Sequence, residues 1–156
     1  MKNVQKIIDL FGGLESLKDH ALKIVASGFM PLCIEYIGTG PRNLPLVSVA
    51  HYGQLNGDPM RDPDMVFEAM PTAEGDPRSG RWLPISYRND YVALYQEAVF
   101  VNEAGQVMVK PRLERDLTAF ARLWDRNLKD QGFLEAAQVA AWQVPPAYVT
   151  QPKEGD

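Results

Sequence analysis

Side chains able to bind a divalent metal ion are concentrated in one stretch of the sequence, between positions 51 and 68. They are His51, Asp58, Asp62, Asp64 and Glu68. Magnesium prefers carboxylate oxygens, and a histidine would also suit manganese or zinc. An ion held by His51, Asp58, Asp62 and Asp64 could activate water for phosphodiester hydrolysis. This hypothesis makes the chain a divalent-metal-dependent phosphoesterase or nuclease.

The same residue types also suit a structural role. Asp58 and Asp62 each precede a proline, and such aspartates bond to backbone amides in turns. The spacing matches no metal-binding motif, and the calcium-loop pattern Asp-x-Asp-x-Asp-Gly is absent. We therefore expect His51, Asp58 and Asp62 mainly to fix a long connection over residues 53–64, with His51 bridging from the strand to an aspartate.

Composition and charge limit the possible classes of protein. The chain has 156 residues, 46% of them hydrophobic and 23% charged, as in ordinary globular proteins. Its net charge of -4 gives no basic footprint for direct nucleic-acid binding. The single cysteine, Cys33, lies in an apolar run, which indicates a buried thiol and fits a reducing cytoplasm. With no signal peptide or membrane-spanning run evident, we expect a cytoplasmic protein without a cofactor.

The middle of the chain is rich in predicted strands, and a short helix precedes it. Val4, Ile7, Ile8 and Phe11 fall at helical spacing, and we expect Asn3 to cap this helix. Alternating and continuous apolar runs predict strands at 21–26, 31–37, 44–52, 65–70, 81–87, 92–101 and 106–110. The first of these segments could instead extend the preceding helix.

A long amphipathic helix is predicted after the strands. Pro111 suits its first turn, and Gly132 suits its end. Its apolar stripe consists of Leu113, Leu117, Phe120, Ala121, Trp124 and Leu128. A shorter helix is predicted at 134–142. This order predicts an α+β fold, a mostly antiparallel sheet covered by the C-terminal helix, in one domain over 1–150 with a flexible tail at 151–156.

Aromatic residues lie in or beside several predicted loops. Tyrosine and tryptophan in such places can anchor an interface, or they can pack the edges of a small sheet. Both interpretations stay open for Trp82 and Tyr87. Packing is favoured for the others, which are Tyr52, Tyr91, Tyr95 and Trp142.

The central stretch resembles a known but uncharacterised family of small bacterial proteins. The resemblance covers about residues 44–100 and rests on His51-Tyr52-Gly53, Asn56-Gly57-Asp58, Met60-Arg61-Asp62-Pro63, Met65-x-Phe67-Glu68, Trp82-x-Pro84 and Asn89-Asp90-Tyr91. Leu55 and Pro59 depart from the pattern, where glutamine and leucine are expected. The family is a domain of unknown function encoded on plasmids, phages and integrative elements, so the resemblance implies accessory cargo of a mobile element.

Two functions follow from these observations. The first is a non-catalytic binding protein of a mobile genetic element with a protein partner, such as an inhibitor of a restriction or CRISPR system. The second is the metal-dependent phosphoesterase or nuclease. The first is preferred, because no recognisable catalytic arrangement is present. The residues expected to form the binding or structural motif are His51, Tyr52, Asn56, Asp58, Arg61, Asp62, Asp64, Glu68, Trp82, Tyr87, Asn89 and Asp90.

Overall fold

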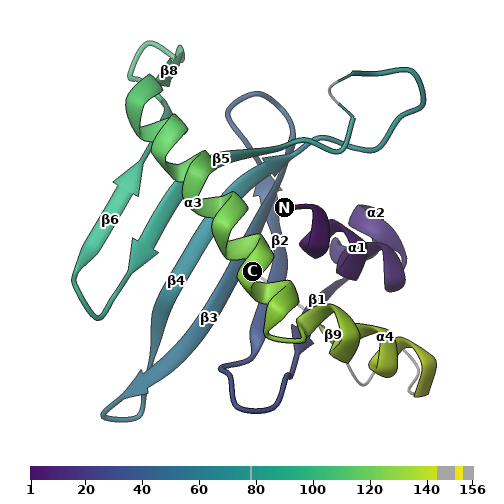
Figure 1. Cartoon of the computed structure of the whole chain (residues 1–156). Coiled ribbons are helices and arrows are strands. Elements are labelled where there is room, and N and C mark those ends of the chain that lie inside the picture. Colours follow the sequence, from purple (N-terminus) through teal and green to yellow (C-terminus); the bar gives the residue numbers. More distant parts are fainter. Residues whose placement is uncertain (78, 144–149, 153–156) are drawn as a thin grey trace.

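An antiparallel sheet forms the centre of the computed structural model, which describes residues 1–77, 79–143 and 150–152. Its seven described strands run in the order β6-β5-β4-β3-β2-β1-β9, so strands that are consecutive in the chain lie side by side (Figure 1). Their bounds are β1 His20–Ile24, β2 Leu32–Thr39, β3 Pro45–Leu55, β4 Asp58–Ala69, β5 Trp82–Asn89, β6 Leu94–Glu97 and β9 Thr150–Pro152. Two further strands, β7 Val99–Val101 and β8 Val107–Val109, form a separate hairpin.

Helices lie on one face of this sheet. They are α1 Lys2–Leu10, α2 Gly13–Leu17, α3 Pro111–Asp130 and α4 Phe133–Gln143, and α3 crosses in front of the sheet in Figure 1. The stripe of α3 is buried as its spacing predicts, from Leu117 to Leu128. Below it, Val49 and Met65 are fully buried on facing positions of β3 and β4. The predicted α+β fold with a mostly antiparallel sheet is therefore confirmed.

The predicted long connection at 53–64 is wrong. Strands β3 and β4 continue through this region and are joined by a two-residue turn at Asn56 and Gly57, which have φ angles of 52° and 86°. Asn-Gly suits such a turn, because both central residues need a positive φ. The sequence did not predict the ends of β3 and β4 next to this turn as strands, because these ends are polar and because prolines lie within β4. Pro59 lies next to the turn, and Pro63 lies where the register between β3 and β4 shifts.

The N-terminal helix is capped from outside, and the expected Asn3 cap is wrong. Helix α1 begins at Lys2, so Asn3 lies within it. The buried carboxylate of Asp125, on α3, accepts hydrogen bonds from the backbone amides of Asn3 and Val4, each 3.1 Å long. It also accepts one from Asn3 Nδ2 at 3.1 Å. A negative charge at a helix N-terminus is favourable, so Asp125 caps α1 and joins it to α3.

The strand predicted at 21–26 is confirmed as β1, and the alternative in which this segment extends the preceding helix is wrong. Two other predicted segments differ from the structure. The predicted strand 92–101 divides into β6, which pairs with β5, and β7, which pairs with β8. Residues 151 and 152 of the expected tail belong to β9, which pairs with β1, and residues 153–156 lie outside the described residues. In the described part of the chain, no helix is long and apolar enough to cross a membrane.

We expect Trp124→Ala to lower the free energy of unfolding by about 3–5 kcal/mol, because it leaves a cavity between α3 and the sheet. Trp124 is 7% exposed, and its ring lies against His51 and Phe120. Its neighbour Leu123 is 53% exposed and provides the control, since Leu123→Ala should change stability by less than about 0.5 kcal/mol. Urea unfolding of both variants measures the difference, and equal losses would contradict this packing.

Candidate functional site

His51 lies on the helix-covered face of the sheet, within the core. It is 7% exposed, and its Nδ1 donates a hydrogen bond to the carbonyl oxygen of Pro31 at 3.0 Å. Its ring centroid lies 5.8 Å from that of Trp124 and 5.5 Å from that of Phe133. The expected bridge from His51 to an aspartate is therefore wrong. Alternation along β3 directs His51 toward the helices and its neighbour Ala50, which pairs with Asp64, toward the other face.

Trp82 and Tyr87 also pack beneath the helices. Trp82 Nε1 donates to Gln5 Oε1 of α1 at 3.0 Å, and its ring lies edge-on to Phe67 at 5.5 Å. The ring of Tyr87 lies edge-on to Phe120 of α3, with the centroids 5.4 Å apart. Of the two interpretations left open for these residues, the contacts favour packing.

The opposite face of the sheet is not packed against the helices, and we call it the open face. Adjacent strands place Cys33, Ala50, Asp64, Arg88 and Tyr95 in one row across it. The next row consists of Glu35, Ser48, Val66, Ser86 and Glu97. Tyr52 and Arg61 are paired beyond the first row, toward the β3–β4 turn. The open face is thus built from five strands and carries acids, arginines and tyrosines together.

Asp90 joins two arginines at one end of the open face. Its carboxylate accepts hydrogen bonds from the backbone amide of Arg61 at 2.9 Å, from Arg61 Nη1 at 3.4 Å and from Arg88 Nε at 3.2 Å. The amide of Asp90 donates in return to the Arg61 carbonyl oxygen at 2.9 Å. The bond from the Arg61 amide, and then the two positive charges, lower the pKa of Asp90. Asp90 therefore stays ionised and ties the turn after β5 to β4.

Asp64 is the more deeply buried acid of this network. Ser48 Oγ donates a hydrogen bond to its Oδ1 at 2.7 Å, and Arg61 Nε lies 3.5 Å from its Oδ2. Burial nevertheless raises the pKa of Asp64, against the opposing effects of Ser48 and Arg61. Burial, with the negative charge of Asp64, also raises the pKa of Tyr52 to about 12. The Tyr52 hydroxyl therefore keeps its proton across the physiological range.

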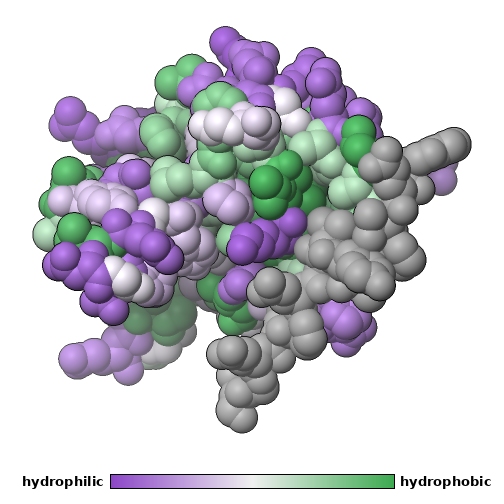
Figure 2. All heavy atoms as spheres, turned by 90° about the horizontal axis from the view of Figure 1, so that it is seen from below, coloured by the Kyte–Doolittle hydropathy of each residue, from purple (hydrophilic) through white to green (hydrophobic). Residues whose placement is uncertain are grey.

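A second set of bonds fixes the turn between β5 and β6. Asn89 Nδ2 donates to Asp62 Oδ1 at 2.9 Å, and Asn89 Oδ1 accepts from the amide of Tyr91 at 3.1 Å. The Tyr91 hydroxyl then donates to the Gln54 carbonyl oxygen at 3.2 Å. Gly53 allows this contact, since a Cβ at that position would meet the Tyr91 hydroxyl. Seen from below, the end of the molecule with the β3–β4 turn mixes hydrophilic and hydrophobic side chains (Figure 2).

Glu68 has a separate structural role at the other end of β4. It is fully buried and accepts hydrogen bonds from the amides of Arg42 at 2.9 Å and Leu44 at 3.3 Å. Arg42 Nη1 lies 3.2 Å from the second carboxylate oxygen. Gly40 lies directly over the Glu68 side chain, because an added Cβ would be 2.5 Å from its Cγ. Glu68 therefore holds the turn between β2 and β3 and does not join the open-face network.

The four proposed metal ligands do not come together. His51 lies under the helices and Asp64 lies on the open face, while Asp58 is exposed beside the β3–β4 turn with Asn56. Within residues 1–77, 79–143 and 150–152, no three His, Cys, Asp or Glu side chains form a group that could hold a metal ion. The site residues that the sequence predictions missed are Ser48 and Arg88. Strand alternation would have placed Ser48 on this face, whereas Arg88 lies one residue beyond the predicted strand 81–87.

The fold and the open face together define a class of small α+β proteins with an antiparallel sheet, helices on one face and a polar network on the other. A family model described as a domain of unknown function, DUF6908, matches residues 2–134. The chain therefore belongs to this family. Searches of curated proteins and of solved structures gave no match.

The structure gives different expectations for two aspartates that the sequence treated alike. Asp62→Ala should lower stability by about 1 kcal/mol, since Asn89 loses its partner. Asp58→Ala serves as the matched control and should stay within about 0.5 kcal/mol of wild type, because Asp58 is exposed. Chemical denaturation measures both values. If Asp58→Ala lowered stability as much as Asp62→Ala, the positions described for these side chains would be contradicted.

Asp90 should make stability depend on pH in a defined direction. Its pKa is lower in the folded state, so it stabilises the fold above about pH 4 and loses this effect as pH falls through its folded pKa. Asp90→Asn should therefore be less stable than wild type near neutral pH, and the difference should shrink on acidification. The raised pKa of Asp64 acts in the opposite direction, but Asp64 is present in both proteins, and the charge of Asp90 is the smallest cause of its shift. A difference that is constant down to about pH 3 would contradict the network.

Proposed function

We propose that this protein is a non-catalytic binding protein that contacts a partner protein through the open face. The observation that supports it is the set of tyrosine and arginine side chains there, which are held by the carboxylates of Asp64, Asp90 and Glu97. Tyrosine and arginine are enriched among the residues that dominate binding energy at protein interfaces. Arg61 and Arg88 are 39% and 48% exposed, so they remain accessible although both are paired with Asp90.

Tyr95 extends this surface toward the edge of the sheet. It is 56% exposed, its hydroxyl donates to Glu97 Oε2 at 3.0 Å, and the Arg88 guanidinium lies 5.7 Å from its ring centre. A side chain that is held before binding loses less conformational entropy when the partner arrives. The exposed aromatic ring therefore supports binding at a lower cost than a freely rotating tyrosine would.

The acids on the open face and beside it support a positioning role over a metal-binding role. Asp62, Asp64 and Asp90 each accept a hydrogen bond from another residue. A metal ion would have to displace these donors to reach the carboxylates. The metal-dependent phosphoesterase is the rival proposal, and it requires the network to open.

The character of the face suggests the kind of partner. Positive Arg61 and Arg88 lie among the acids Glu35, Asp64, Asp90 and Glu97, so the face carries charges of both signs. Interfaces of non-obligate complexes combine such polar contacts with a few aromatic anchors. The face therefore suits a folded protein with an equally mixed surface better than a uniformly charged polymer.

The resemblance to proteins of mobile elements provides a biological setting for this proposal. Accessory proteins of plasmids and phages often block a host defence system by binding one of its components. We propose that the protein acts in this way in the bacterial cytoplasm, as an inhibitor of restriction or CRISPR type. This narrower proposal rests on the resemblance alone, whereas the binding role rests on the open face.

Affinity capture from a host bacterium tests the binding role with two matched baits. Tyr95→Ala combined with Arg88→Ser changes the open face, while Leu123→Ala combined with Arg126→Ser changes the exposed side of α3. A specific partner should be retained by wild type and the α3 variant and lost by the open-face variant, with all three folded by circular dichroism. Equal capture by all three baits would contradict the use of this face.

Thermal melting with manganese or magnesium tests the rival enzyme. A ligand that binds only the folded state raises the melting temperature. The binding proposal expects no change with either metal. A rise in wild type that disappears in Asp64→Asn would make the metal-dependent phosphoesterase the better proposal.

A further inference from the structure

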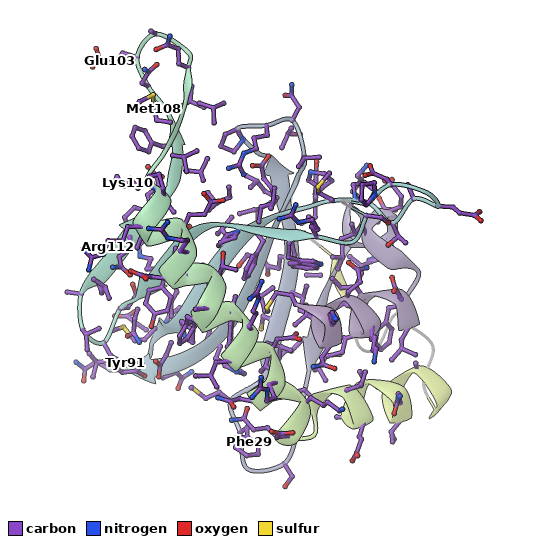
Figure 3. All side chains as sticks on the ribbon, turned by 45° about the horizontal axis from the view of Figure 1, so that its top comes forward. Phe29, Tyr91, Glu103, Met108, Lys110 and Arg112 are labelled. Atoms are coloured by element: carbon purple, nitrogen blue, oxygen red, sulfur yellow. The ribbon has the colours of Figure 1, made fainter. Side chains whose placement is uncertain are left out.

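The hairpin of β7 and β8, which we call the arm (residues 99–109), extends away from the rest of the molecule. In Figure 3 it carries Glu103 at its tip and Met108 along it, with Lys110 at its base and Arg112 at the start of α3. Every residue of β8 is exposed, although all three are apolar. Val107, Met108 and Val109 are 42%, 40% and 39% exposed. An isolated two-stranded hairpin with exposed apolar side chains is marginally stable by itself.

The tip of the arm is nevertheless closed by several hydrogen bonds of one side chain. Asn102 Oδ1 accepts hydrogen bonds from the amides of Ala104 at 3.0 Å and Gln106 at 2.9 Å. Asn102 Nδ2 donates to Gln106 Oε1 at 3.0 Å, and Gly105 provides the positive φ of 77° that the turn needs. The arm is therefore a preformed surface, since its turn is closed by its own side chains.

The outer edge of β8 presents unpaired backbone groups. The Lys110 amide donates to Ala98 and the Asn102 amide to Gln106, at 2.8 Å and 2.9 Å. Hydrogen bonds in an antiparallel pair alternate, so Met108 bonds toward β7. The amides and carbonyls of Val107 and Val109 therefore point away from it. Natural proteins often protect such edges with charges or prolines, and Val107-Met108-Val109 contains neither.

We propose that this edge pairs with β8 of a second copy, which forms a dimer with a continuous four-stranded sheet. A two-fold axis through Met108 would place Val107 of one copy opposite Val109 of the other. Both residues point their backbone groups outward, so each pair can exchange two hydrogen bonds. The two-fold axis relates the two copies, so each copy needs only the outer edge of its own β8 to form the contact.

The same register brings like side chains together. Met108 would face Met108 of the second copy at a non-hydrogen-bonded position, where side chains approach most closely. Phe100 pairs with Met108 in the arm, so the two phenylalanines would flank the two methionines. On the other side of the sheet, Val107 and Val109 would form cross-strand pairs. Pairs of this kind stabilise antiparallel sheets.

Charge complementarity favours a second copy over an unrelated strand. Antiparallel pairing sets the tip of one arm beside the base of the other, so Glu103 would approach Lys110 and Arg112 of its partner copy. All three side chains are exposed. Within the described part of the chain, neither Glu103 nor Arg112 has an ion-pair partner. The second copy would provide the missing opposite charge for each.

Sedimentation equilibrium of the full chain over a range of concentrations tests the dimer. Wild type should be in a monomer–dimer equilibrium. Met108→Glu should shift it to monomer, because it places two like charges opposite each other. Val139→Glu is the control, since Val139 is exposed on α4, away from the arm, and this variant should dimerise like wild type. Unchanged melting of Met108→Glu at low concentration, where wild type is also monomeric, would show that it still folds.

A charge exchange tests the orientation of the two arms. Glu103→Lys and Arg112→Glu should each weaken the dimer, and the two together should restore it. A wild type that is monomeric at every concentration would overturn the proposal. A dimer that Met108→Glu leaves intact would also overturn it, because the contact would then lie elsewhere.

Discussion

The placement of helices on only one face of the sheet is the constraint on which the other features depend. Successive residues of a strand point to opposite faces, so a buried face fixes the direction of every side chain in the strand. The carboxylate of Asp125 supports this arrangement, since it caps α1 from α3 and holds both helices over the same face. His51 is thereby directed into the core, and Asp64, which pairs with its neighbour Ala50, is directed away from it.

On the open face, the charged side chains pair with one another. Asp64 and Asp90 show how position decides the balance, because both lie near Arg61 but their pKa values shift in opposite directions. For Asp64, burial outweighs the hydrogen bond from Ser48. For Asp90, the amide and guanidinium donors lower the pKa by more than desolvation raises it. Single exposed ion pairs contribute little to stability, but the two ion pairs that share Arg61 restrict each other. The main effect of the network is therefore to order the side chains.

The sequence predicted most of the helices and strands, but it predicted fewer of the contacts in the candidate site. The stripe of α3 is long and strictly periodic, and burial of such a stripe is hard to avoid. Residues 53–64 were misinterpreted as a loop because polar strand ends and prolines resemble turn sequences locally. Only the pairing of Tyr52 with Arg61 and Gly53 with Met60 shows that they are strands. The Asp125 cap lies more than a hundred residues from α1 in the chain, so no local pattern could reveal it. Alternation along β3 places His51 on the face of Val47 and Val49, but the sequence did not reveal that its partner there is the Pro31 carbonyl oxygen and not an aspartate.

The open face and the arm differ in chemistry, and this difference suggests how they would work together. The open face is polar and made of fixed side chains, which favours specific contacts of moderate strength. The arm is apolar, and a two-fold axis would repeat its contact, which favours association of like chains. A dimer formed through the arm would present two open faces on one particle. A partner with two copies of the target surface would then meet the second face at a high effective concentration, provided that the spacing matches. Each face would need only moderate affinity, so a small polar surface would be sufficient to hold such a target.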